Sequence, residues 1–314
     1  MQMYAFELRG HSGGKFNMRK ISSLALGLSL SIAAGTFASA QDTPAAGALP
    51  NVLQITREYT KPGKGGAMHD KTESAFVQAM ARAKEPAHYL ALNSLSGKSR
   101  AIFLTWYASF DAWEKDINAV NKNAALSAEL ERANVADGEL LDSADQAVFY
   151  FDPELSYRPH ADISHARFME VSEYHVKRGH ESGWRELAKM VIAAHQKAGT
   201  SAHWAMLNLV FGGDGGTYLI LSADKSMADI DHGFAEDKAF HDAMGDEGWK
   251  KFEQLYADTV DDSHNELFAI NPKQSYMDES VIKEDPDFWK PTAAAPAKTR
   301  AASASAKSAD KSKQ

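Results

Sequence analysis

The feature that most limits how this chain can fold is an internal repeat with a shift of 115 residues. Identical residues at this shift occur in successive parts of the chain: His88 and His203, Leu92-Asn93 and Leu207-Asn208, Gly97 and Gly212, and Glu58-Tyr59 and Glu173-Tyr174. After an insertion of four residues the shift becomes 119, and Asp142 and Phe149 then meet Asp261 and Phe268. A register kept over this length predicts two copies of one module of roughly 110 residues.

Each copy has the residue pattern of a β-α-β-β-α-β unit. β-Branched and aromatic runs indicate the strands, and apolar residues at helical spacing indicate the helices. In the first copy the predicted strands are 52–59, 87–95, 101–107 and 146–151, with helical sequence at 67–84 and 111–134. In the second copy they are 168–176, 202–211, 217–222 and 265–270, with helical sequence at 181–198 and 226–258.

A sheet of this type carries both helices on one face and leaves the other face to be buried. The second strands, Tyr89-Leu90-Ala91-Leu92 and Trp204-Ala205-Met206-Leu207, are apolar on both sides. Strands buried on both faces indicate that the two sheets cover each other. The predicted fold class is therefore α+β: two tandem ferredoxin-like modules packed sheet to sheet as a pseudo-dimeric α+β barrel.

The chain resembles the dimeric α+β-barrel superfamily, of the antibiotic-biosynthesis-monooxygenase-like or stress-responsive type. The resemblance covers about residues 50–277 and rests on the element order, on the turn Lys61-Pro62-Gly63, and on the helix-end stretches 121–125 and 236–241. It implies a ligand between sheet and helices or inside the barrel. An enzyme of this kind would be a cofactor-independent, monooxygenase-like oxidoreductase. Haem-handling members make haem an alternative cofactor, with His195 as its candidate axial ligand.

The N-terminus has the pattern of a secretory signal peptide. Met18-Arg19-Lys20 precedes an uncharged run that closes with Ala38-Ser39-Ala40, a small-residue cleavage site before Gln41. We expect cleavage after Ala40, export to the periplasm or beyond, and no transmembrane segment in the mature chain. An uncleaved membrane anchor is the alternative.

The remaining boundaries follow from composition and from the repeat. The predicted parts are residues 1–40 as N-terminal extension and signal peptide, 41–50 as linker, 51–158 as the first module, 159–166 as a second linker, 167–277 as the second module, and 278–314 as a C-terminal extension, disordered from about residue 291. The chain is expected to be a monomeric pseudo-dimer or a homodimer.

Charge and cysteine content exclude several classes of function. The net charge is −8 although both ends are basic, so the body of the chain is strongly acidic and would repel nucleic acid. The basic C-terminal tail is either a solvated linker or a contact to the cell envelope. The absence of cysteine excludes thiolate nucleophiles, thiolate metal sites and iron–sulfur clusters.

Aromatic and polar residues alternate along the second and third strands, as in a small-molecule pocket. The ligand-binding candidates are His88, Asn93, Trp106, Tyr107, His203, Trp204, Asn208 and Tyr218. The alternative is an aromatic core in which the asparagines cap turns and the histidines bond to the backbone. No metal site is predicted, because no His-x-x-x-His pair occurs, and a solvated acidic helix accounts for His232, Glu236, Asp237 and His241 better than a carboxylate–histidine site does. Nucleotide-binding and serine-hydrolase motifs are absent from the sequence.

The sequence thus predicts an exported protein that binds or oxidatively transforms a small, partly aromatic molecule, without a cofactor and with unidentified catalytic residues. A non-catalytic structural or envelope-interaction module is the alternative, and a haem-binding barrel is a third reading. Because the copies differ, with His69 against Trp184 and Trp106 against Leu221, any site is expected in one copy only.

Overall fold

The computed structural model describes residues 49–290, and the predicted α+β class is confirmed. The first half contains, in chain order, β1 (Val52–Thr60), α1 (Ala67–Ala83), β2 (Tyr89–Ser94), β3 (Arg100–Tyr107), α2 (Phe110–Lys122), α3 (Ala124–Gly138) and β4 (Leu141–Phe151). The second half contains β5 (Phe168–Val176), α4 (Glu181–Ala198), β6 (Ala205–Phe211), β7 (Thr217–Asp224), α5 (Met227–Ala235), α6 (Asp237–Thr259) and β8 (Val260–Ile270). Two short helices follow, α7 (Glu279–Glu284) and α8 (Pro286–Trp289).

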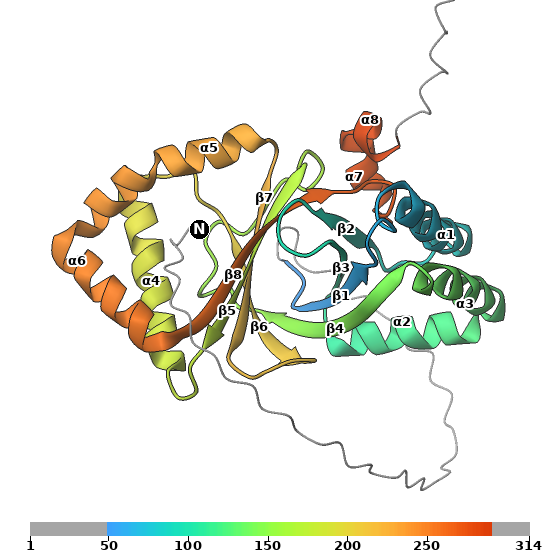
Figure 1. The fold of residues 1–314 in the computed structure, drawn as a ribbon, viewed down its shortest axis with the longest axis horizontal. Helices are drawn as coiled ribbons and strands as arrows, with labels where there is room; N and C mark the ends of the chain where they lie inside the picture. Colours follow the sequence, from blue (N-terminus) through green and yellow to red (C-terminus); the bar gives the residue numbers. More distant parts are fainter. Residues whose placement is uncertain (1–48, 291–314) are drawn as a thin grey trace, which may run out of the picture.

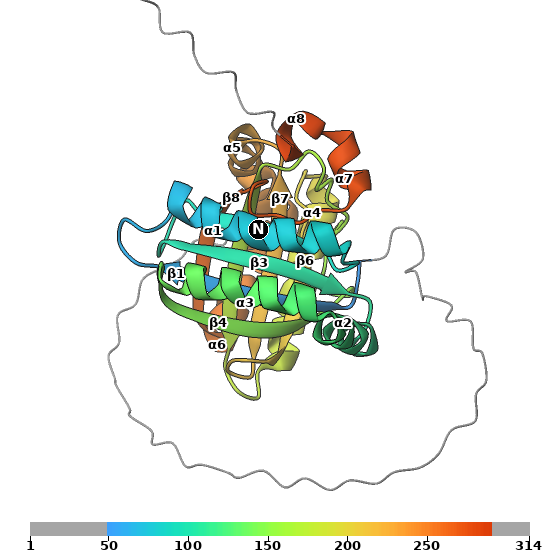
Figure 2. The same cartoon turned by 90° about the vertical axis from the view of Figure 1, so that its right-hand side faces the viewer.

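The strands of both halves form one closed antiparallel barrel in the order β1-β3-β2-β8-β5-β7-β6-β4. The two halves meet edge to edge, where β2 pairs with β8 and β4 pairs with β6. The helices α1 to α3 lie on one side of the barrel and α4 to α6 on the opposite side (Figure 1). Figure 2 shows α1 and α3 lying over the sheet of the first half and running roughly along β3 and β4. The faces that were expected to cover each other therefore line one shared interior.

That interior is apolar over most of its height. Its largest fully buried side chains come from five strands: Leu53, Leu92, Phe149, Leu207 and Phe268. A second apolar layer lies between the barrel and helices α4 and α6, and it is centred on Tyr174, Trp184 and Trp204. The alternation of side chains along each strand separates these two layers.

The strands β4 and β8 begin five residues earlier than predicted, at Leu141 and Val260. In β4, residues 142–146 are all exposed, so this part of the strand lacks the apolar alternation that marks a half-buried strand. Hydrogen bonding to β1 alone holds it in place. The two long helical segments are also each divided, at Asn123 and at Glu236.

The alignment of the first strands at a shift of 115 is wrong by one residue. The β1–β4 register shifts between Tyr59 and Thr60, and the β5–β8 register shifts between His175 and Val176. These equivalent irregularities place Glu58 at the position of Tyr174, rather than at that of Glu173. A one-residue change moves a side chain to the other face of a strand, so Glu58 faces the helices whereas Glu173 faces the barrel interior.

The residues after β8 close one end of the barrel. Trp289 on α8 is 5% exposed and belongs to the same core cluster as Leu53 and Phe149. Its indole Nε1 donates a hydrogen bond to the carbonyl oxygen of Ser164 at 2.9 Å. Residues 278–290, predicted only as an extension, are thus part of the fold. The predicted signal peptide and the segment from 291 onward lie outside the described residues. Among the described helices, none is long and apolar enough to cross a membrane.

Replacing Trp289 by alanine is expected to lower the free energy of unfolding by about 3–5 kcal/mol, because a large buried side chain would leave a cavity. Urea denaturation followed by circular dichroism measures the change. The control is Phe234→Ala, since Phe234 is 49% exposed and its loss should change stability by no more than about 0.5 kcal/mol. Equal effects of the two substitutions would show that the C-terminal helices do not close the barrel.

Candidate metal centre

Four side chains with metal-ligating atoms converge in the first half, between the sheet and its helices. They are Glu58 on β1, His69 and Glu73 on α1, and Asp137 on α3. One ligand atom from each lies within 4.8 Å of all the others. The Nε2 atom of His69 is 3.1 Å from Glu58 Oε2, 3.3 Å from Asp137 Oδ1 and 3.8 Å from Glu73 Oε1. It is the only such group of three or more side chains in the part of the chain that the structure describes.

Regular secondary structure sets this arrangement. His69 and Glu73 are separated by four residues, so they lie on the same face of α1. Glu58 is on the helix-facing side of β1, and α3 packs along α1 and brings in Asp137 from its last turn. A carboxylate near the C-terminus of a helix faces the negative end of the helix dipole. Asp137 therefore needs a positive partner more than an ordinary aspartate does.

The cluster is buried and incompletely hydrogen-bonded. His69, Glu73 and Asp137 are each no more than 3% exposed, whereas the side chain of Glu58 is 15% exposed. Thr72 Oγ1 donates a hydrogen bond to Asp137 Oδ1 at 2.5 Å. The Oε1 atom of Glu73 has no hydrogen-bond partner within the described residues. A buried carboxylate oxygen without a donor is costly, so this atom is poised to accept a cation.

The loop after β8 completes the surroundings of the cluster from the other half of the chain. Gln274 is fully buried, and its Nε2 atom lies 3.5 Å from His69 Nδ1 and 3.1 Å from Asp70 Oδ1. Asn271 Nδ2 donates to the same Asp70 oxygen at 2.7 Å. The ring of His69 is thus contacted through Nδ1 by the amide of Gln274, while Nε2 faces the carboxylates. In an imidazolium, or in a histidine that binds through Nε2, Nδ1 carries a hydrogen, so the amide nitrogen of Gln274 packs against this atom and does not hydrogen-bond to it.

The pKa values of the cluster are strongly shifted. Burial alone would lower the pKa of His69, but the hydrogen bonds and charges of Asp137, Glu58 and Glu73 outweigh it and raise the pKa to about 10. Burial, followed by the charges of Glu58 and Asp137, raises the pKa of Glu73 to about 9. At neutral pH the cluster therefore holds an imidazolium and a neutral carboxyl. A divalent cation in place of these two protons would leave its total charge unchanged.

The sequence contained one signal for this centre that the search for paired histidines missed. His69 and Glu73 form a His-x-x-x-Glu pair in a helix, which presents an imidazole and a carboxylate one turn apart. Glu58 and Asp137 are distant in the sequence, and only the packing of β1, α1 and α3 brings them in.

The second half has aromatic side chains in the corresponding place. Tyr174 stands where β1 has Glu58, and Trp184 aligns with His69. The ring centroids of Trp184 lie 5.1 Å from those of Tyr174 and 5.0 Å from those of Tyr218. These rings form a packed core, so the carboxylate–histidine centre exists in the first half only.

The eight residues predicted to bind a ligand do not meet in one site. Trp204 and Tyr218 belong to the aromatic core under α4, and Trp204 Nε1 donates to the carbonyl oxygen of Leu155 at 2.9 Å. Tyr107 faces α2 and donates to Asp116 Oδ2 at 3.0 Å, whereas its neighbour Trp106 packs against the barrel interior. The others are also separate: His88 stacks on Tyr276, Asn93 is on β2, Asn208 on β6 contacts Asp152 just after β4, and His203 lines a cavity.

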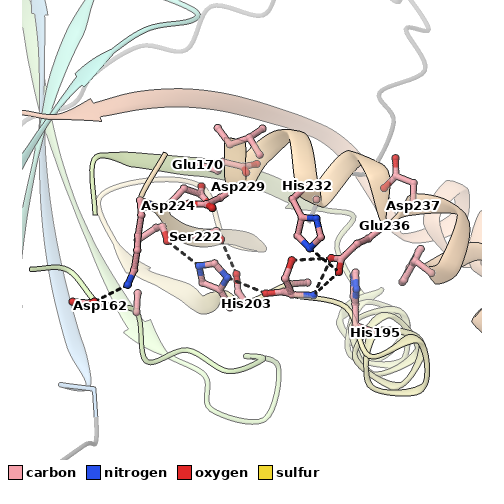
Figure 3. A pocket seen from close by; sticks show the side chains of 18 of the residues that line it. Asp162, Glu170, His195, His203, Ser222, Asp224, Asp229, His232, Glu236 and Asp237 are labelled. Carbon is pink, nitrogen blue, oxygen red and sulfur yellow. Dashed lines mark hydrogen bonds and ion pairs between the residues drawn. The ribbon is translucent and has the colours of Figure 1, made fainter. Parts of the chain in front are cut away.

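That cavity lies between β7, α4 and α5 and has a volume of about 390 Å³ (Figure 3). His195 on α4 is part of its wall. The ring of His195 stacks on Phe240 at 4.3 Å between centroids, and its Nδ1 atom is 2.8 Å from Thr200 Oγ1. Burial lowers the pKa of His195 to about 4, so the ring is neutral at physiological pH.

The surroundings of His195 do not fit a haem. The cavity is lined by six carboxylates and one lysine, and the lysine is already paired with Asp162. The propionate groups of a haem would be repelled by such a lining. The ring of His195 is also covered by Phe240 and approached edge-on by Trp204.

A larger cavity of about 790 Å³ opens at the end of the barrel opposite to Trp289. Its mouth carries charged side chains that pair with one another. Arg57 lies 3.7 Å from Glu173, and Arg100 donates to Glu266 at 2.9 Å. Deeper in, Ile102, Leu104 and Leu221 line the same space. The two arginines at the mouth are thus each paired with a carboxylate.

No protein-family model and no curated protein sequence matches the chain. Among solved structures it is similar to a candidate monooxygenase from Lactobacillus acidophilus, at 7% identity and a TM-score of 0.44 over 70% of this chain and 94% of the other. It is also similar to an anthrone oxidase-like protein, at 10% identity and 0.45 over 73% and 94%. A third is chlorite dismutase from Candidatus Nitrospira defluvii in complex with imidazole, at 7% identity and 0.41 over 74% and 94%.

The stability of the fold is expected to fall with acidification because of His195. Its pKa is about 4 in the folded protein and about 6.5 in the unfolded chain, so the unfolded chain takes up the proton first as the pH falls. The stability due to the neutral ring is complete above about pH 6.5 and is lost toward pH 4. After allowance for partial solvent screening, the loss is about 1–2 kcal/mol.

The measurement is urea denaturation at pH 7, 6, 5 and 4 for the unmodified protein and for His195→Gln. The difference between the two curves removes the contributions of all other groups, and it should shrink as the pH falls. Val135→Ala, at an exposed site with no titrating group, is the control and should give a flat difference. A flat difference for His195→Gln as well would contradict the assignment.

Proposed function

We propose that this protein binds one divalent transition-metal ion in the first half of its barrel. The ligand atoms are Glu58 Oε2, His69 Nε2, Glu73 Oε1 and Asp137 Oδ1. The observation that carries the proposal is their convergence within 4.8 Å in a buried site where one carboxylate oxygen lacks a hydrogen-bond partner among the described residues. Three carboxylates with one imidazole suit Mn²⁺, Fe²⁺ or Zn²⁺ better than they suit Cu⁺, which prefers sulfur.

The position of the site supports an ion that exchanges with solvent. Glu58 is the most exposed ligand, and it lies at the end of β1 beside the turn that leads into α1. The other ligands are held by two packed helices, so an ion could enter past Glu58 without opening the fold. Four protein ligands would also leave coordination positions of Mn²⁺ or Fe²⁺ free for water or a small molecule. We therefore place the proposed transformation of a small molecule at the metal.

We further propose that the two halves are copies of one module, arranged within one chain as a pseudo-dimer. Their identical strand order, with the last strand beside the first, then the third and the second, supports this reading. In this view the first copy has kept a polar site between sheet and helices, and the second has filled the same place with Tyr174 and Trp184. Because one chain supplies every strand of the barrel, we expect a monomer.

Metal binding is testable by isothermal titration calorimetry on the purified protein after chelator treatment, with MnCl₂ and ZnCl₂ and, under anaerobic conditions, a ferrous salt. One ion per chain is expected for at least one of these metals, together with a higher melting temperature. Glu73→Gln and Asp137→Asn should each weaken binding at least tenfold, because each replaces an anionic ligand by a neutral amide.

The variants separate metal binding from folding. A glutamine at position 73 resembles the neutral carboxyl that the metal-free cluster holds, so the metal-free variant should fold normally. Asp116→Asn is the matched control, since Asp116 is a partly buried carboxylate of the same half that is bound by Tyr107 and lies outside the cluster. The proposal fails if no metal binds stoichiometrically, or if all three variants bind with the affinity of the unmodified protein.

We also propose that the protein is exported and cleaved after Ala40. The support is the basic segment, the uncharged run and the Ala38-Ser39-Ala40 site in the sequence. Intact-mass measurement of the protein from the periplasmic fraction of a Gram-negative host should give a chain that begins at Gln41. Ala40→Arg should retain the precursor mass. A full-length chain in the cytoplasmic fraction would contradict export.

A further inference from the structure

The cavity of the second half is distinct from the metal centre and has an acidic lining (Figure 3). The carboxylates that line it are Asp162, Glu170, Asp224, Asp229, Glu236 and Asp237. A metal ion does not explain them, because no three of these carboxylates and the nearby histidines converge closely enough to hold one in the described chain. The carboxylates differ in whether the protein already uses them.

Three of the carboxylates are already used by the protein itself. Lys225 Nζ lies 2.9 Å from Asp162 Oδ2. Asp229 accepts the backbone N–H groups of Lys225 and Ser226 and thereby caps α5. Glu236 accepts hydrogen bonds from the backbone N–H and the hydroxyl of Ser201. These groups shape the wall of the cavity and are not free to bind a ligand strongly.

Glu170 and Asp224 are the two carboxylates of the cavity that lie side by side on the sheet. Phe168 pairs with Asp224, and Glu170 pairs with Ser222, so the two acidic side chains are diagonal neighbours on the same face of β5 and β7. Within residues 49–290, neither side chain has a hydrogen bond or an ion pair to a cationic group. Asp224 is only 6% exposed, and its Oδ2 atom is buried without a partner. When both carboxylates are ionised they repel each other, and a cation placed between them would relieve this repulsion.

The electrostatics of Asp224 agree with that geometry. Burial, followed by the negative charge of Glu170, raises the pKa of Asp224 to about 6, although His203 acts in the opposite direction. The nearest lysine, Lys225, directs its ammonium group to Asp162. Among residues 49–290, no lysine or arginine is paired with Glu170 or Asp224.

The rest of the cavity offers apolar and aromatic surface. Phe240 and the neutral ring of His195 stack on each other in its wall, and Val191 and Ile230 line it as well. A purely ionic ligand would gain nothing from these side chains. A ligand with a cationic group and an apolar body would satisfy both parts of the cavity.

We propose that this cavity binds a small primary amine with an aromatic or apolar body. Its ammonium group would lie between Glu170 and Asp224, and its body would lie against Phe240 and His195. An ammonium group has three donors and no acceptor, which matches two carboxylates that lack donors. The site shares no residue with the metal centre, so either proposal can fail without the other.

The test is calorimetric titration of the mature protein at pH 7.5 with three probes that share a phenethyl group: phenethylamine, the neutral 2-phenylethanol and the anionic 3-phenylpropionate. Phenethylamine should bind with one molecule per chain and at least tenfold more tightly than the alcohol, and the acid should not bind. Asp224→Asn and Glu170→Gln should each weaken amine binding about tenfold, the usual effect of losing one charge-assisted hydrogen bond.

Asp261→Asn is the control, since it removes the same charge from an exposed position on β8 and should leave amine binding unchanged. Asp224→Asn relieves repulsion inside the cavity, so its melting temperature should be unchanged or higher, which separates loss of binding from loss of folding. Failure of phenethylamine to bind at millimolar concentration, equal binding of the alcohol, or equal weakening by Asp261→Asn would each overturn the proposal.

Discussion

Backbone hydrogen bonds at two seams, between β2 and β8 and between β4 and β6, underlie everything else in this structure. A four-stranded sheet has two edges with unpaired N–H and C=O groups and one face without helices. Pairing the edges of one half with those of the other satisfies both needs at once. It also creates the shared interior of the barrel, on the side of the strands opposite to the candidate metal centre. At the β4–β6 seam the fit is close: Gly212 adopts a φ of +91°, and a Cβ atom there would lie 2.3 Å from the carbonyl oxygen of Gln146.

The two helix-covered layers differ in how they balance stability against chemistry. In the second half, Tyr174, Trp184 and Tyr218 fill the layer, and large aromatic side chains are strong contributors to a core. In the first half the same place holds buried carboxylates, whose desolvation costs several kcal/mol each unless a cation compensates. Such a local departure from good packing is expected where function requires it. The second half and the shared interior thus stabilise a barrel whose first half carries a polar site.

The α+β class, the strand order in each half and most element boundaries were predictable because apolar periodicity records which face of an element is buried. The starts of β4 and β8 were not, since their exposed residues have no such periodicity. The structural equivalence of Glu58 and Tyr174 could not be predicted, because a local irregularity in strand pairing has no characteristic residue type. Of the residues predicted to bind a ligand, His203 lines the acidic cavity. The binding role of all eight predicted residues stays a prediction. The metal centre depends on Asp137 and Glu58, which only the packing of α1 on α3 and β1 brings together.

The contact of Gln274 with His69 has a consequence for the order in which the protein can mature. The chain is made from its N-terminus, so all four proposed ligands exist once α3 has been synthesised. The residues that pack on His69 and hold Asp70, namely Gln274 and Asn271, follow β8, the last strand of the barrel. The first half therefore cannot complete its own centre while the second is still being made. The candidate site is therefore fully enclosed only after β8 has joined the barrel, and an incomplete chain would carry the four side chains without Gln274 and Asn271 around them.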